Sequence, residues 1–205
     1  MIETRSAEHW NERYVGGDLP WDTQQAERRF VEVVGELQPP TRRAMDLGCG
    51  TGTNALWLGR EGFETIGIDI AAAAVERARQ RAREAGLEQV RFACASVLDP
   101  LPVEPGTIGV ATDRGCFHTV GADDRPRYAQ RVAEALAAGG WWVMICGSAD
   151  EIRAEGEHGP PQLTAGQIAA AVEPRFEVHR LERSSFTGSD DRPTHIAWRG
   201  VLRRR

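Results

Sequence analysis

The chain has 205 residues and a formal net charge of −5, a length that suits one domain able to bury its core without disulfides or metal. The acidic balance gives no general field for phosphate backbones, so nucleic acid is disfavoured as a partner. No apolar stretch approaches the ~18 residues of a membrane span, and no secretory signal pattern opens the sequence. The four cysteines form no C-x-x-C pair, which predicts reduced thiols in a cytoplasmic protein and no metal site.

The first 22 residues are polar but carry Trp10, Tyr14 and Trp21, with the breaker GGDLP between the last two. Two interpretations stay open. These aromatic residues pack a helix onto the main domain, or they form a lid over a bound ligand. Residues 24–37 then predict a helix, because apolar residues recur at 3.6-residue spacing up to Pro39.

Strands and helices alternate through the middle of the chain. The apolar runs predict strands at 44–47, 64–69, 90–95, 107–113 and 141–147, and helices after the first glycine turn and at 71–86, 124–138 and 164–172. The 124–138 helix is expected to end at a Gly139-Gly140 turn, and a polar loop is expected at 148–163. Residues 176–183 and 194–204 read as an antiparallel pair separated by the turn TGSDDRP.

This order predicts an α/β fold with a doubly wound, seven-stranded, mostly parallel sheet and an antiparallel C-terminal edge strand, a Rossmann-like architecture. We expect one domain over residues 1–205. Within it, residues 1–38 form an N-terminal helical lid and residues 40–205 form the cofactor-binding core. In such sheets ligands bind beyond the carboxyl ends of the strands, where the strand order reverses.

The first candidate for that position is the stretch AMDLGCGTGTNALWL, residues 44–58, in which Gly48, Gly50 and Gly52 alternate between a strand and a helix. A turn without side chains lets a ligand lie against the backbone. Thr53 stands where a dinucleotide fingerprint has its third glycine, and the absence of a Lys-Ser/Thr pair excludes a P-loop. Asp69 ends the second strand, 21 positions after Gly48, where it suits both hydroxyls of a ribose.

The longer pattern DLGCGTGTNALWL, GFETIGIDI and ATD resembles the class I S-adenosylmethionine-dependent methyltransferases over roughly residues 40–150. The resemblance implies S-adenosyl-L-methionine as cofactor and S-adenosyl-L-homocysteine as product. It implies that Asp46 and the glycine turn hold the methionine end and that Asp69 holds the ribose. At the adenine position the family usually has Asp, whereas this chain has Ser96. The implied cofactor-binding residues are Trp10, Trp21, Asp46, Gly48, Cys49, Gly50, Thr53, Asn54, Asp69, Ile70, Ser96, Val97 and Asp113.

Three further stretches, WNERYVGGDLPWD, DRGCFHTV and HGPPQLT, together resemble the thiopurine S-methyltransferase-like group over nearly the whole chain. That group methylates small thiols, thiocyanate, halides, or tellurium and selenium compounds. It implies a small-molecule thiol as partner and a monomer or weak homodimer. Base-modifying methyltransferases resemble N/D-P-P-Y/F/W after the fourth strand, whereas residues 113–117 here read DRGCF.

Methyl transfer is an in-line displacement that needs a strong nucleophile. A free thiol has a pKa near ~8.5, so a nearby cation or base increases the thiolate. The predicted catalytic residues are Arg114 as the cation and Asp113 or His118 as the proton acceptor. The predicted substrate residues are Tyr14, Arg114, Phe117, His118 and Pro160. Asp113 as a cap of its loop and His118 as a structural residue remain open alternatives.

The sequence therefore predicts a methyltransferase acting on the sulfur of a small thiol. The alternative within enzymes is methylation of an inorganic or halide-like anion such as thiocyanate, a halide or tellurite, which needs an anion pocket and no base. A non-catalytic cofactor-binding module is the alternative from another class.

Overall fold

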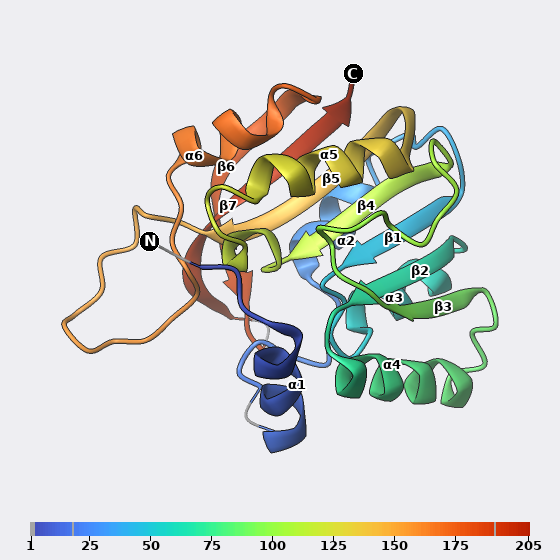
Figure 1. The fold of residues 1–205 in the computed structure, drawn as a ribbon, viewed down its shortest axis with the longest axis horizontal. Coiled ribbons are helices and arrows are strands. Elements are labelled where there is room, and N and C mark those ends of the chain that lie inside the picture. The colour runs from blue at the N-terminus through green and yellow to red at the C-terminus, as the bar shows by residue number, and fades with distance from the viewer. Residues whose placement is uncertain (1–2, 18, 191) are drawn as a thin grey trace.

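The computed structural model describes residues 3–17, 19–190 and 192–205. The start of the predicted lid at residues 1–2, Asp18 of the predicted breaker and Asp191 of the predicted turn lie outside these ranges. The described residues form a seven-stranded sheet with helices on both faces (Figure 1), in the strand order β3-β2-β1-β4-β5-β7-β6. This order confirms the doubly wound, Rossmann-like sheet.

The strands are β1 (Arg43–Leu47), β2 (Glu64–Asp69), β3 (Val90–Cys94), β4 (Ile108–Arg114), β5 (Leu136–Gly147), β6 (Phe176–Thr187) and β7 (Pro193–Arg204). The helices are α1 (Ala7–Gly16), α2 (Arg28–Val34), α3 (Thr53–Arg60), α4 (Ala72–Glu84), α5 (Arg125–Ala135) and α6 (Ala165–Val172), with a 3-10 turn η1 at Phe117–Thr119. None of the helices in the described ranges has both the length and the apolar character of a membrane span.

The structure differs from the sequence prediction in the position of β7 and in the starts of β5 and α2. The antiparallel strand β7 lies between β5 and β6, so the sheet edge is β6. After the β6–β7 turn, strand β7 runs antiparallel to both β5 and β6 and lies between them. Strand β5 starts at Leu136 and runs through Gly139 and Gly140, because Gly139, with φ 71°, forms an irregularity inside the strand and not a turn before it. Helix α2 is also shorter than predicted, since it begins after Glu27.

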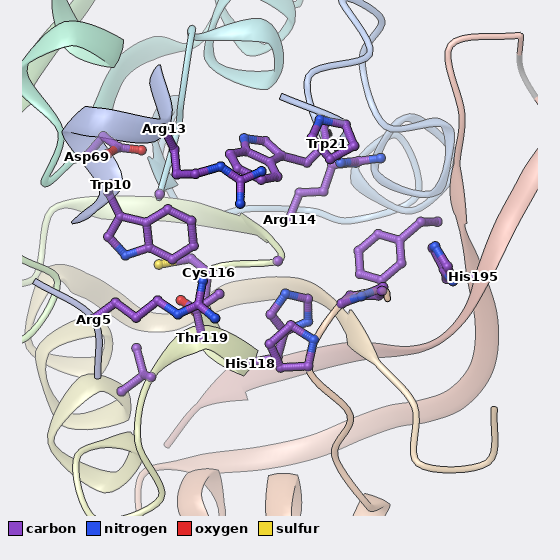
Figure 2. Close-up of a pocket in the computed structure, with 18 of the residues that line it drawn as sticks. Arg5, Trp10, Arg13, Trp21, Asp69, Arg114, Cys116, His118, Thr119 and His195 are labelled. Atoms are coloured by element: carbon purple, nitrogen blue, oxygen red, sulfur yellow. Dashed lines mark hydrogen bonds between the residues drawn. The ribbon is translucent and has the colours of Figure 1, made fainter. Parts of the chain in front are cut away.

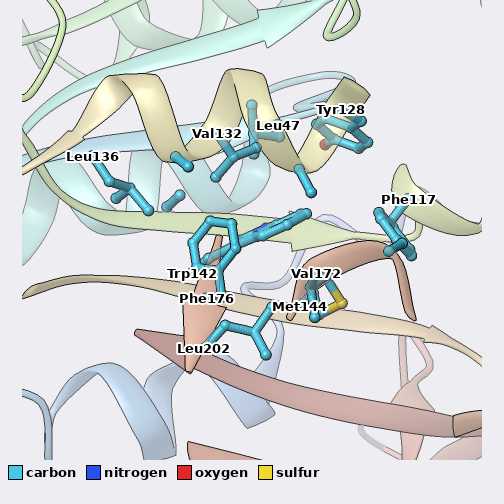
Figure 3. Close-up of a cluster of buried hydrophobic side chains, with 14 of the residues drawn as sticks. Leu47, Phe117, Tyr128, Val132, Leu136, Trp142, Met144, Val172, Phe176 and Leu202 are labelled. Carbon is cyan, nitrogen blue, oxygen red and sulfur yellow. The ribbon is translucent and has the colours of Figure 1, made fainter. Parts of the chain in front are cut away.

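The main hydrophobic core lies between the sheet and the helices α5 and α6 (Figure 3). Trp142 is fully buried at its centre, with ring centroids 5.5 Å from Tyr128 and 5.4 Å from Phe176. Trp141 packs against the second core, on the side of α2 and α3. Neighbouring residues of β5 thus face opposite layers, as the alternation of a strand requires.

Helix α1 is fastened to the body of the protein beside α4 (Figure 1). The N-cap position of α4, Ala71, has no side-chain cap of its own. Instead the Asn11 side-chain oxygen of α1 accepts a hydrogen bond of 2.9 Å from the backbone N–H of Ala73. Since the first N–H groups of a helix lack partners within it, this contact satisfies one of them. The N-terminal segment is therefore a packed part of the domain.

Candidate functional site

A cavity of about 1330 Å³ lies beyond the carboxyl ends of β1, β2 and β4. The strand order reverses between β1 and β4, so the cavity occupies the position expected for a ligand in this class of sheet. Its walls come from α1 and the segment after it, the glycine turn, the loops after β3 and β4, the 149–163 loop and the β6–β7 turn. Figure 2 shows Asp69 and His195 at opposite ends of it.

The glycine turn permits two close approaches that no other residue would allow. Gly48 and Gly50 have φ values of 62° and 53°, in the left-handed region. A Cβ on Gly48 would lie 2.6 Å from the Cys116 Cβ, and one on Gly50 would lie 2.7 Å from the Tyr14 hydroxyl. Both the backbone conformation and the packing therefore require glycine at these positions.

Asp69 is held at the cavity wall in one orientation. Its two carboxylate oxygens accept hydrogen bonds from the backbone N–H groups of Gly50, at 2.8 Å, and Ala71, at 2.9 Å. Burial raises its pKa from the ordinary value. Ile70 and Ser96 line the cavity beside it, as does Val97. A fixed carboxylate with free lone pairs next to a side-chain-free turn fits a ribose, and the ribose role of Asp69 stays a prediction.

Six predicted cofactor residues do not line the cavity: Asp46, Cys49, Gly50, Thr53, Asn54 and Asp113. The Asp46 Oδ1 accepts from the Thr112 hydroxyl at 2.8 Å, and its Oδ2 has no partner among the described residues. Burial raises the pKa of Asp46 to about 7. Cys49 packs among apolar side chains of α3, α4 and β3. The predictions for Thr53 and Asn54 also need correction, because their side chains form hydrogen bonds to other residues of the protein. The Thr53 hydroxyl accepts from Arg81, and the Asn54 side chain accepts from the Glu27 N–H.

An aromatic group from the N-terminal segment covers the side of the cavity nearest the glycine turn. The Trp21 ring stands edge-on to Trp10, at 5.9 Å, and to Tyr14, at 6.1 Å. Its indole N–H donates to the Tyr14 hydroxyl at 3.2 Å. The guanidinium of Arg13 lies 4.8 Å from the Trp21 ring, and Arg5 lies over Trp10 (Figure 2). The three aromatic residues pack α1 onto the domain and also line the cavity, and their role as a lid over a ligand stays a prediction.

Asp113 and Phe117 lie away from the cavity. The Asp113 carboxylate accepts from the Cys116 N–H at 2.8 Å, from the Phe117 N–H at 3.2 Å and from the Tyr128 hydroxyl at 2.7 Å, and burial raises its pKa to about 6. These contacts correspond to the alternative in which Asp113 caps its loop. Phe117 is fully buried against Tyr128 and Trp142, so its prediction as a substrate residue is wrong.

The aromatic residue that lines this part of the cavity is Phe186 of β6. Its ring lies 5.9 Å from the His118 ring, edge-on. Nothing in the sequence distinguished it, because β6 carries no motif and only the sheet order brings it next to the loop after β4.

Arg114 joins three distant segments. Its Nε donates to the Glu27 carboxylate at 2.8 Å, and its Nη atoms donate to the backbone oxygens of Trp21, at 3.0 Å, and Thr187, at 2.8 Å. Glu27 is buried and also accepts from the Thr187 hydroxyl at 2.7 Å. Arg114 lines the cavity as predicted, but it is fixed by a carboxylate and two carbonyls. Glu27 and Thr187 were not predicted, because their role depends on contacts across 160 residues.

His118 is buried at the centre of the cavity wall, with a side-chain hydrogen bond that fixes its ring. Its Nδ1 accepts from the Gly147 N–H at 2.8 Å. Burial, with smaller effects from Arg114, Arg125 and Arg153, lowers the pKa of His118 to about 3. The ring is therefore neutral and carries its proton on Nε2, and its one lone pair is already used. Pro160 lines the cavity nearby on the 149–163 loop, as predicted.

Comparisons with known proteins find methyltransferases among the proteins similar to this chain. The model of the thiopurine S-methyltransferase family matches residues 5–201. The thiopurine S-methyltransferase of Bordetella petrii is 26% identical over 197 residues, which cover 90% of this chain and 89% of that protein. The 2-heptyl-1-hydroxyquinolin-4(1H)-one methyltransferase of Mycobacteroides abscessus is 28% identical over 126 residues, 62% of this chain and 55% of that relative's length.

One solved structure superposes on this chain with a TM-score of 0.81 at 22% identity. It concerns the conversion of a disulfide bond into a thioacetal group during echinomycin biosynthesis. The alignment covers 97% of this chain and 92% of that one. At this identity the similarity shows a shared fold.

Proposed function

Since this chain belongs to the thiopurine S-methyltransferase family of S-adenosylmethionine-dependent enzymes, we propose that it methylates the sulfur of a small-molecule thiol. The observation that carries the proposal is one continuous cavity. One part of it, here the cofactor part, contains the glycine turn and Asp69, and another, here the acceptor part, contains His118, Phe186 and Pro160. Donor and acceptor can then meet within a single cavity, which an in-line displacement requires.

The residues around the glycine turn fit S-adenosylmethionine. Asp69 offers a fixed carboxylate to the ribose, and Ser96 offers a hydroxyl near the adenine position, although its oxygen also accepts from the Leu98 N–H at 3.1 Å. Gly48 of the glycine turn lines the cavity and can present backbone to the methionine end. When bound, the cofactor supplies a methyl group on a positively charged sulfonium.

The remaining cavity residues position the acceptor and exclude water. Trp21, Tyr14 and Phe186 present aromatic surface, and Pro160 adds a rigid wall. Removing water helps a reaction in which a thiolate and a sulfonium lose their charges together. Arg114 fixes the geometry of this part, because it ties the segment at Trp21 to the β6–β7 turn.

Methylation of an inorganic anion is the second candidate function. It is favoured by one observation, that neither predicted proton acceptor is available. The Asp113 oxygens accept hydrogen bonds from the loop after β4 and from Tyr128, and the lone pair of the His118 ring accepts one from the Gly147 N–H. An anion such as thiocyanate needs no base.

The test is product analysis after incubation with cofactor carrying an isotopically labelled methyl group. The panel contains thiols, oxygen acceptors, thiocyanate and iodide, and mass spectrometry locates the label. Label on thiol sulfur supports the proposal, whereas label only on oxygen or on an anion contradicts it. Binding of S-adenosylhomocysteine in calorimetry without any labelled product would indicate a non-catalytic module. Asp69→Asn is expected to weaken that binding, and the exposed Asp99→Asn serves as its matched control.

A further inference from the structure

Resting on the proposed function, we propose that the acceptor binds as an anion ionised in solution and that the neutral His118 ring donates its Nε2–H to it. The enzyme then selects acidic acceptors and removes no proton itself. His118 is a donor that binds and orients the substrate, which is the opposite of the base role expected from the sequence.

The orientation of the His118 ring carries this inference. Gly147 N–H occupies Nδ1, so the single proton of the neutral ring must be on Nε2. No acceptor for Nε2 is found in residues 3–17, 19–190 or 192–205, and the ring forms part of the cavity wall. Gly115 leaves space beside this atom, because a Cβ at that position would lie 3.3 Å from Nε2. The atom that faces the acceptor is therefore a fixed hydrogen-bond donor.

The charged side chains that act on His118 are all positive, whereas β5 and β6 contact its ring through the uncharged Gly147 and Phe186. Arg114 comes from β4, Arg125 from α5 and Arg153 from the 149–163 loop, and together with burial they lower the pKa of His118 to about 3. Arg114 and Arg153 have carboxylate partners in Glu27 and Glu151. The buried Arg125 donates to the Val120 carbonyl and has no carboxylate partner in the part of the chain that the structure describes. A positive charge without a counter-charge that acts on the His118 ring favours an anion beside that ring.

The carboxylates of the site cannot easily take the proton instead. Those lining the cavity within the described ranges are Asp69 and Glu3. Asp69 accepts two backbone N–H groups at the cofactor part of the cavity, and Glu3 is exposed near the start of the chain. Glu151 is paired with Arg153 and also lies 3.0 Å from His195.

The reaction then balances without a protein base. The thiol loses its proton to solvent before binding, and the thiolate enters beside the His118 donor. The acceptor sulfur bonds to the methyl carbon as that carbon's bond to the sulfonium breaks, and the negative and positive charges disappear together. Acceptors that are mostly protonated at neutral pH pay the free energy of ionisation and react more slowly.

A spectroscopic titration tests the inference without turnover. The probe is 4-nitrothiophenol, whose absorption spectrum distinguishes thiol from thiolate, added to the protein saturated with S-adenosylhomocysteine. We expect the bound probe to stay ionised to a lower pH than the free probe. A bound probe whose pKa is unchanged or raised overturns the proposal.

Two substitutions separate the donor role of His118 from its structural one. In His118→Asn the amide oxygen can still accept from Gly147, but the donor toward the cavity is lost. This variant is expected to bind the thiolate about 10-fold more weakly or worse, the range for a hydrogen bond to a charged group. His118→Gln can retain a donor near the Nε2 position and is expected to stay within about threefold of the original affinity. Thermal unfolding of both variants identifies any loss of folding, and equal affinities in two folded variants refute the donor role.

The pH dependence of kcat/KM over several thiols provides the second test. The break in the profile is expected at the pKa of each free thiol and should move from one thiol to the next. A break at one fixed pH for all thiols assigns proton removal to a protein group such as His158 and overturns the proposal. Failure to methylate any thiol, with the probe still bound as thiolate, refutes the proposed thiol function and leaves the anion site intact.

Discussion

The contact between Glu27 and Arg114 gives the sharpest stability prediction. Glu27 has a side chain that is 0% exposed, and Arg114 is 12% exposed, with Nε 2.8 Å from the carboxylate. Glu27→Gln leaves the guanidinium buried without a counter-charge, which costs about 3–5 kcal/mol when a buried pair loses one partner. Arg114→Gln leaves the buried carboxylate in the same position. The double variant contains neither charge, so its loss is expected to be smaller than the sum of the two by at least about 2 kcal/mol.

Urea unfolding of the four proteins measures this coupling free energy. The matched control is the exposed ion pair between Arg180 and Glu36, 3.1 Å apart with side chains 37% and 64% exposed. The same cycle of Gln substitutions there is expected to yield less than about 1 kcal/mol. If the cycle at Glu27 and Arg114 gives a coupling as small as the surface pair, the claim that these residues hold the acceptor part of the cavity together is refuted.

Three further predictions concern individual parts of the site. Gly50→Ala places a methyl group 2.7 Å from the Tyr14 hydroxyl and should weaken S-adenosylhomocysteine binding at least about 10-fold in calorimetry, whereas Gly86→Ala, at a similar φ of 64° but with no atom within 4 Å, should leave it unchanged. Asp113 has its pKa raised from 3.8 to about 6, so its stabilising contribution is complete below pH 3.8 and is lost as the pH rises through 6. Asp113→Asn should remove about 3 kcal/mol of pH dependence from urea unfolding across that window, and an unchanged slope argues against it. Phe186→Ala should raise the KM of the acceptor several-fold without changing S-adenosylhomocysteine affinity, and equal effects on both ligands would place Phe186 outside the acceptor part.

The sequence predicted the sheet and the cofactor part of the cavity because both depend on local patterns. Gly48, Gly50 and Asp69 lie in strand ends and turns whose conformations follow from nearby residues. Gly48 and Asp69 line the cavity, whereas Gly50 does not. The errors within this part have a common cause. The motif indicates which residues are near the cofactor but not which side chains face it, and Cys49 and Thr53 face helix α4 instead.

The acceptor part was predicted less well because its geometry depends on contacts between distant segments. The sequence DRGCFHTV contains one aromatic residue, and Phe117 was the natural candidate for the cavity. The Asp113 carboxylate binds the N–H of Phe117 and turns its ring toward Tyr128 and Trp142. Phe186, about 70 residues later in the chain, lines the cavity instead. Its position depends on the order of the strands in the sheet, which the local sequence does not determine.

The two parts of the cavity depend on different contacts: the cofactor part on local ones and the acceptor part on contacts between distant segments. The cofactor part rests largely on the turn after β1 and the carboxylate of Asp69, which backbone N–H groups hold. The acceptor part converges on Arg114, which joins the backbone at Trp21, 93 residues away, to that at Thr187, 73 residues away. A changed residue in the β6–β7 turn alters the position of Thr187 and, through Arg114, the aromatic group at Trp21. Substitutions in the β6–β7 turn can thus change acceptor selectivity through a single polar junction at Arg114.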